Sequence, residues 1–294
     1  MNRSGVMGLV LLASVTSCAH GDSARVAAPP AADAEPSEAQ AAAGLRDHHR
    51  HHHHGGITQF IAMSLDTLGT DDAKRPQIEK LQGDLHTCMA PARVIETNLL
   101  STLADGVAAG AIDTAKVNAT LVQLGTAVEG VHDCVATPLN ALHALLAPVE
   151  RAALVDKVQA HYEVWRQVNL ETTPGGQEPD SQPAELADEL GLTPDQVAQL
   201  SAAFRTKLTD AGLGTFEAPR VEAHLKAFET AFATETFDAK AITANANSQL
   251  TQHGARRMAL FYETATPLLT VAQRTTLADH LRARELPPLN VSNK

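Results

Sequence analysis

Two short stretches, Leu192-Thr193-Pro194-Asp195-Gln196 and Leu269-Thr270-Val271-Ala272-Gln273, share the pattern Leu-Thr-x-x-Gln and decide the fold. In this pattern the Thr hydroxyl accepts a hydrogen bond from the backbone N–H three residues later, and the Gln side chain accepts one from the Thr N–H. Such a capping box begins a helix. Pro194 suits the first helical position, because its missing N–H would have no partner there. We therefore predict that a helix begins at each of the two threonines.

Apolar residues recur at steps of three and four, which places them on one face of a helix. The stripes before residue 140 are Ile78, Leu81, Leu85, Cys88, Ala92, Ile95, Leu99 and Leu103, then Val117, Leu121, Leu124, Val128, Val131 and Val135. The glycine-bounded break at residues 106–110 is short, so these two helices should form an antiparallel hairpin. Similar stripes follow the first capping box. We expect an all-α fold.

Two cysteines, Cys88 and Cys134, lie at similar distances from the hairpin break and should face each other. A disulfide is the leading interpretation in an oxidising compartment, where it would stabilise the protein by about 2–4 kcal/mol. His86 and His132 each precede a cysteine by two residues, which leaves a zinc site as the alternative. Helix geometry disfavours zinc, because residues two apart point to different faces.

The two halves of the chain repeat one order of helices. In the first half, Asp71 and Lys74 stand where the first Leu-Thr-x-x-Gln stretch has its Thr and Gln. Ala147 and Glu150 likewise replace the Thr and Gln of the second stretch. Asp is a good N-cap residue, so we predict that Asp71 caps a helix in place of Thr.

This arrangement resembles the Spy/CpxP family of periplasmic stress proteins, which is known for the Leu-Thr-x-x-Gln motif. The second half of the chain matches better, and the first half keeps the order of helices with altered motifs. The resemblance implies two tandem bent helical hairpins, which form an internal pseudo-dimer or a homodimer. It also implies that the protein holds unfolded envelope proteins without ATP; the client-binding residues are unknown. Relatives in the same fold group sense or buffer metals.

The first residues predict export. Residues 1–17 have a basic start and an apolar run too short to span a bilayer, which is typical of a secretory signal. Cys18 follows small residues as in a bacterial lipobox, so we expect it to carry lipid and to anchor the protein to the outer membrane of the cell envelope. The alternative is an ordinary signal cut at Ala19 or beyond. Residues 18–56 contain few large apolar side chains and should form a disordered tether.

Within that predicted tether lies a dense histidine segment, residues 48–54, which contains His48, His49, His51, His52, His53 and His54. Many neutral imidazoles close together bind Ni²⁺, Cu²⁺ or Zn²⁺ without a preformed pocket. The alternative is a soluble spacer without a physiological metal. We expect that the protein requires no cofactor.

A break rich in proline and glycine at residues 172–183 predicts a linker. It would separate a first helical unit at 57–171 from a second at 184–286, followed by a tail at 287–294. The net charge is −11, so we expect no nucleic-acid partner.

No nucleophile elbow, phosphate loop or metalloprotease motif appears, and we expect no enzymatic activity. The leading expectation is an ATP-independent envelope chaperone whose partners are unfolded envelope proteins. The alternatives are a metal sensor or buffer that uses the histidine segment, and a lipoprotein that docks on a membrane sensor kinase.

Overall fold

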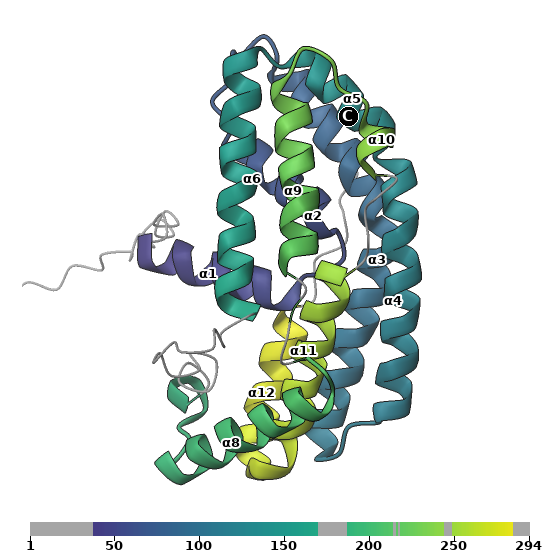
Figure 1. The fold of residues 1–294 in the computed structure, drawn as a ribbon. Helices are drawn as coiled ribbons and strands as arrows, with labels where there is room; N and C mark the ends of the chain where they lie inside the picture. Colours follow the sequence, from purple (N-terminus) through teal and green to yellow (C-terminus); the bar gives the residue numbers. More distant parts are fainter. Residues whose placement is uncertain (1–37, 170–186, 214–215, 217, 244–248, 285–294) are drawn as a thin grey trace, which may run out of the picture. The chain divides into compact units, whose positions relative to one another are not determined.

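The computed structural model describes residues 38–169, 187–213, 216, 218–243 and 249–284 (Figure 1). Within these ranges the fold is all-α, which confirms the expected class, and no strand is present. The helices in chain order are α1 (Glu38–His51), α2 (Gly56–Asp66), α3 (Arg75–Ala109), α4 (Thr114–Cys134), α5 (Ala136–Leu145), α6 (Pro148–Asn169), α8 (Pro194–Asp210), α9 (Ala218–Ala233), α10 (Ala239–Thr243), α11 (Gln249–Ala265), the 3₁₀ helix η1 (Thr266–Leu268) and α12 (Val271–Ala283).

Four of the predicted features lie outside the described residues: the signal at 1–17, the lipidated Cys18, the linker at 172–183 and the tail at 287–294. Among the helices that are described, none combines the length and the apolar character needed to cross a membrane.

Helices α3 and α4 pack against each other as the predicted hairpin. Gly110 ends α3 with a φ of 81°, a left-handed conformation that glycine adopts without a steric penalty. Asp113 caps α4, where its carboxylate accepts the Lys116 N–H at 3.0 Å. A disulfide joins Cys88 of α3 to Cys134 of α4, with their Cα atoms 5.5 Å apart. The hairpin is therefore linked at its open end.

Helices α8 and α12 begin with the two capping boxes. Thr193 Oγ1 accepts the Gln196 N–H at 3.2 Å, and the Gln196 side chain accepts the Thr193 N–H at 3.0 Å. The same two bonds at Thr270 and Gln273 measure 3.3 and 2.9 Å. Each box satisfies N–H groups that have no partner inside the helix.

Helices of the two halves pack on one another. Helix α12 of the second half packs along α3 of the first, and α6 of the first half packs along α9 of the second (Figure 1). The described residues from Glu38 onward belong to one compact unit. The division into units at 57–171 and 184–286 stays a prediction, and any such units pack closely on each other. Helix α12, which carries the fully buried Leu277 and Leu281, packs against α3 of the other half.

The histidine-bearing end of the predicted tether is also part of the fold. From Glu38 the chain forms α1, which packs against α6 and α11, and α2 follows directly. The prediction of a disordered tether across 18–56 is therefore wrong from residue 38 onward. Low hydrophobicity suggested disorder, but α1 packs through its histidines instead of through leucine or valine.

Candidate functional site

The two capping boxes meet each other in space. Gln196 Nε2 donates to Gln273 Oε1 at 3.0 Å, and Gln273 Nε2 donates back to Gln196 Oε1 at 3.3 Å. Each amide also donates to a backbone carbonyl beside the other box: Gln196 to Leu268 O at 3.0 Å, and Gln273 to Leu190 O at 3.4 Å. The glutamines therefore do two things, because they cap their own helices and join α8 to α12. We call this pair the glutamine clasp.

The first half carries a charged counterpart of the glutamine clasp. Lys74 Nζ donates to Glu150 Oε2 at 2.5 Å, and the same oxygen accepts the Ala147 N–H at 2.7 Å. Lys74 and Glu150 hold the positions of the two glutamines in the repeat. An ion pair thus replaces an amide pair at the equivalent place.

Asp71 does not cap a helix, contrary to expectation. Its carboxylate accepts the Ala73 N–H at 3.1 Å inside the turn before α3, and the residue preceding α3 is Lys74, which makes no side-chain cap. Proline favours the first turn of a helix. Pro76 therefore fixes the helix start several residues beyond Asp71.

The histidine segment lies in the interior. Five of its six histidines are between 1 % and 8 % exposed, and His48 is half-buried. His49 Nε2 and His161 Nδ1 of α6 share a hydrogen bond of 3.0 Å. The backbone carbonyl of His49 accepts the Asn169 side chain, also at 3.0 Å. Buried polar groups need such partners, because an unpaired one loses its hydration without compensation.

A fully buried carboxylate, Glu96 of α3, is the centre of these contacts. Its Oε2 accepts the His54 Nδ1 hydrogen at 2.6 Å, and its Oε1 accepts the backbone N–H of His53. His52 Nδ1 lies 3.9 Å from the same carboxylate. Burial alone would raise the pKa of the Glu96 carboxyl. The hydrogen bond and charge of His54, with the attraction of His52 and His53 in their protonated forms, outweigh burial and lower this pKa to about 2.

His53 contacts the single tryptophan of the chain. Its Nε2–H donates to the Arg50 carbonyl at 2.8 Å, so its Nδ1 carries the lone pair. That lone pair accepts the Trp165 indole N–H at 3.5 Å. Gly254 of α11 leaves room for the ring, because a Cβ there would lie 2.5 Å from His53 ring atoms.

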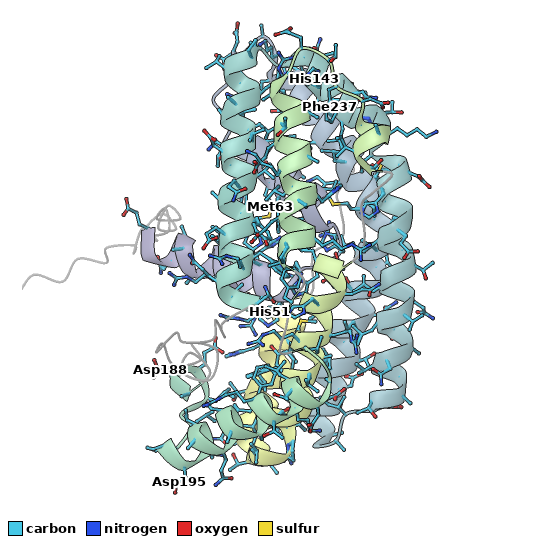
Figure 2. The ribbon with its side chains drawn as sticks, viewed as in Figure 1. His51, Met63, His143, Asp188, Asp195 and Phe237 are labelled. Atoms are coloured by element: carbon cyan, nitrogen blue, oxygen red, sulfur yellow. A yellow bond between two sulfur atoms is a disulfide. The ribbon has the colours of Figure 1, made fainter. Side chains whose placement is uncertain are left out.

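His51 completes a second buried network, at the end of α1 (Figure 2). Its Nδ1–H donates to the Asp47 carbonyl at 3.0 Å, and its Nε2 accepts the Tyr262 hydroxyl of α11 at 2.7 Å. Arg284, at the end of α12, pairs with the Asp47 carboxylate at 2.9 Å. These residues line an open cleft of about 460 Å³ that also includes Glu189. The network therefore attaches α1 to both α11 and α12.

Burial favours the neutral form of three histidines of the segment, His49, His52 and His53. It disfavours the charged imidazole, and it lowers the pKa of His49 and His52 to about 3 and that of His53 to about 4. The charge of nearby His161 lowers the pKa of His49 further, whereas Glu96 opposes the shift at the other two. The rings of His49, His52 and His53 are therefore neutral at neutral pH, while the nearby Glu96 carboxylate is charged.

The predicted metal ligands are thus engaged with protein partners in this structure. In the part of the chain that the structure describes, no three His, Cys, Asp or Glu side chains are grouped so that they could hold a metal ion. His48 Nε2 contacts Gln59 at 3.1 Å, and the His48 and His52 rings lie 4.8 Å apart between centroids. His86 and His132, the alternative zinc ligands, each stand two residues before a cysteine that is bonded in the disulfide.

Sequence reasoning missed Glu96, although the sequence carries a signal for it. Glu96 stands four residues after Ala92 and three before Leu99, which places it on the apolar stripe of α3. A carboxylate at such a position requires a buried partner. The histidine segment supplies that partner from 42 residues earlier in the chain.

No protein-family model, curated protein or solved structure matches this chain. The resemblance to the Spy/CpxP family therefore rests on the motifs of the chain itself.

Proposed function

We propose that this protein is an ATP-independent chaperone, anchored to the outer membrane through lipid on Cys18, that holds unfolded proteins of the cell envelope. The observation that carries the proposal is the glutamine clasp. It brings the two Leu-Thr-x-x-Gln motifs together, and the Lys74–Glu150 pair repeats the arrangement in the first half. Both contacts support a repeated helical architecture of the kind that the resemblance implies.

The packing of helices from one half against helices of the other supports the same proposal. The pairs α12 with α3 and α6 with α9 are reciprocal between the halves. We infer that the chain is an internal counterpart of a dimer of helical hairpins. An internal counterpart would provide in one chain the paired surface that a single unit obtains by dimerising.

The described surface offers clients isolated apolar side chains. The exposed large apolar residues are Val94, Val122, Val149 and Val271, which are 60–75 % exposed. Scattered side chains of this kind are normal on soluble proteins and do not form an apolar patch. Client binding would therefore use both these exposed valines and the negative charge of the protein. The net charge of −11 favours clients with basic segments.

The test is light scattering from several unrelated unfolded clients, with and without an equimolar amount of the protein and in the absence of ATP. We expect slower aggregation, with a larger effect on basic clients than on acidic ones. A variant that combines Gln196→Ala and Gln273→Ala opens the glutamine clasp, and it should lose part of the effect while circular dichroism shows that the helices remain. If the intact protein delays the aggregation of no client, the chaperone proposal fails.

A further inference from the structure

Hydrogen bonds of α1 and of the connection that follows it use ring nitrogens that a metal ion would need. A neutral imidazole has one lone pair, and a metal ligand must donate it. The lone pair of His51 accepts the Tyr262 hydroxyl, and that of His53 accepts the Trp165 indole N–H. These two imidazoles cannot bind a metal while α1 stays where it is.

The histidine segment nevertheless has the composition of a metal chelator. It places six imidazoles within seven consecutive residues. Such a segment, once free of its partners, can gather several neutral rings around Zn²⁺, Ni²⁺ or Cu²⁺, which all accept imidazole nitrogen. The docked and the metal-bound arrangements therefore compete for the lone pairs of His51 and His53.

We propose that the histidine segment is a metal-responsive switch, in which binding of a divalent ion of this class releases α1 from its place against α6 and α11. A ligand that binds one of two states shifts the population toward that state. Release would uncover Trp165 and Tyr262, which are 1 % and 3 % exposed while α1 is docked.

Thermodynamic linkage connects the docking of α1 to the metal affinity of the histidine segment. Docking and metal binding exclude each other, so weakening the docked state must strengthen the apparent affinity for metal by the same factor. Glu96 and Tyr262 belong to the receiving surface and not to the segment. Replacing either one should weaken docking while leaving all six imidazoles intact. A site that included Glu96 as a ligand would respond in the opposite direction.

The experiment titrates the full chain with Zn²⁺ at pH 7.5 and follows the emission of Trp165, the single tryptophan. Zn²⁺ has a filled d shell and no redox chemistry, which keeps the readout simple. We expect Zn²⁺ to shift the emission to longer wavelength while most of the helical circular dichroism remains. Zn²⁺ that does not bind, or that binds without changing the Trp165 emission, overturns the proposal.

Variants then distinguish Zn²⁺ binding that releases α1 from Zn²⁺ binding at another place on the protein. Glu96→Gln should bind Zn²⁺ about tenfold more tightly or better, because it weakens a buried charged contact. Tyr262→Phe removes only the hydroxyl bonded to His51, and it should act in the same direction with less disturbance of the fold. Glu79→Gln, at an exposed position of the same helix as Glu96, is the matched control and should leave the affinity unchanged.

Replacing imidazoles should have the reverse effect. A variant with both His48→Gln and His52→Gln should bind Zn²⁺ more weakly than the wild type. If both Glu96→Gln and Tyr262→Phe bind Zn²⁺ no more tightly than the wild type, docking of α1 and metal binding do not compete and the proposal is refuted. None of these measurements uses a client, so the outcome is independent of the chaperone proposal.

Discussion

Glu96→Gln tests the buried histidine cluster through stability. The substitution preserves size but removes the charge that accepts hydrogen bonds from His54 Nδ1 and the His53 N–H. The Gln amide nitrogen would face one of these donors, so one contact is lost. Burial raises the pKa of Glu96, but the contacts with the histidines outweigh it and lower this pKa from an ordinary value of 4.5 to about 2, so these contacts stabilise the folded protein while the carboxylate is charged.

The sign of the pH dependence follows from that shift. A carboxyl whose pKa is lower in the folded state stabilises the protein above pH 4.5, and this contribution is lost as the pH falls from 4.5 toward 2. Glu96→Gln should therefore lower the free energy of unfolding by about 2–4 kcal/mol at neutral pH. The difference from wild type should stay constant down to about pH 5 and shrink only below 4.5.

The assay is urea denaturation followed by Trp165 emission and by circular dichroism, with Glu79→Gln as the exposed control on α3. A double-mutant cycle with His54→Gln should give a coupling energy of about 1–3 kcal/mol. The reasoning is refuted if Glu96→Gln differs from the control by less than about 0.5 kcal/mol, which is the range of ordinary surface substitutions.

Three further predictions address the packing, the clasp and the anchor. Gly254→Ala would place a Cβ 2.5 Å from the His53 ring, and it should destabilise the protein by about 1–3 kcal/mol in urea denaturation. Gly130→Ala, in a helix with nothing within 4 Å, should instead stabilise it by up to about 1 kcal/mol; equal effects of the two would contradict the tight contact. Gln273→Ala removes a cap and the clasp, and it should lower the free energy of unfolding by about 1–2 kcal/mol, so a neutral result would count against both roles. Cys18→Ser should move the protein from the membrane fraction to the soluble envelope fraction, and unchanged fractionation would exclude the lipid anchor.

Local rules account for what the sequence could predict. Capping at the two Leu-Thr-x-x-Gln stretches depends on groups three residues apart, so it is readable from the chain alone. The same holds for the apolar stripes of α3 and α4, and for Gly110 at the turn between them. Once the hairpin is predicted, the facing positions of Cys88 and Cys134 follow from their spacing.

Long-range partners account for what the sequence could not predict. The histidine segment contains little that is hydrophobic, and its burial depends on Glu96, His161 and Tyr262, which come from three different helices. Composition alone favours a solvated spacer for such a segment. The same limit applies to the packing between the two halves, because α12 carries an ordinary apolar stripe that does not say which half it packs against.

The central claim is that the histidine segment is part of the folded interior and not a spacer. Amide hydrogen exchange of the full chain at neutral pH, without added metal, tests it most directly. The His53 N–H donates to a fully buried carboxylate, so we predict that residues 49–54 exchange far more slowly than an unfolded peptide and approach the protection of α3. Exchange of this segment at the rate of an unfolded peptide, with α3 and α6 protected, would contradict the account.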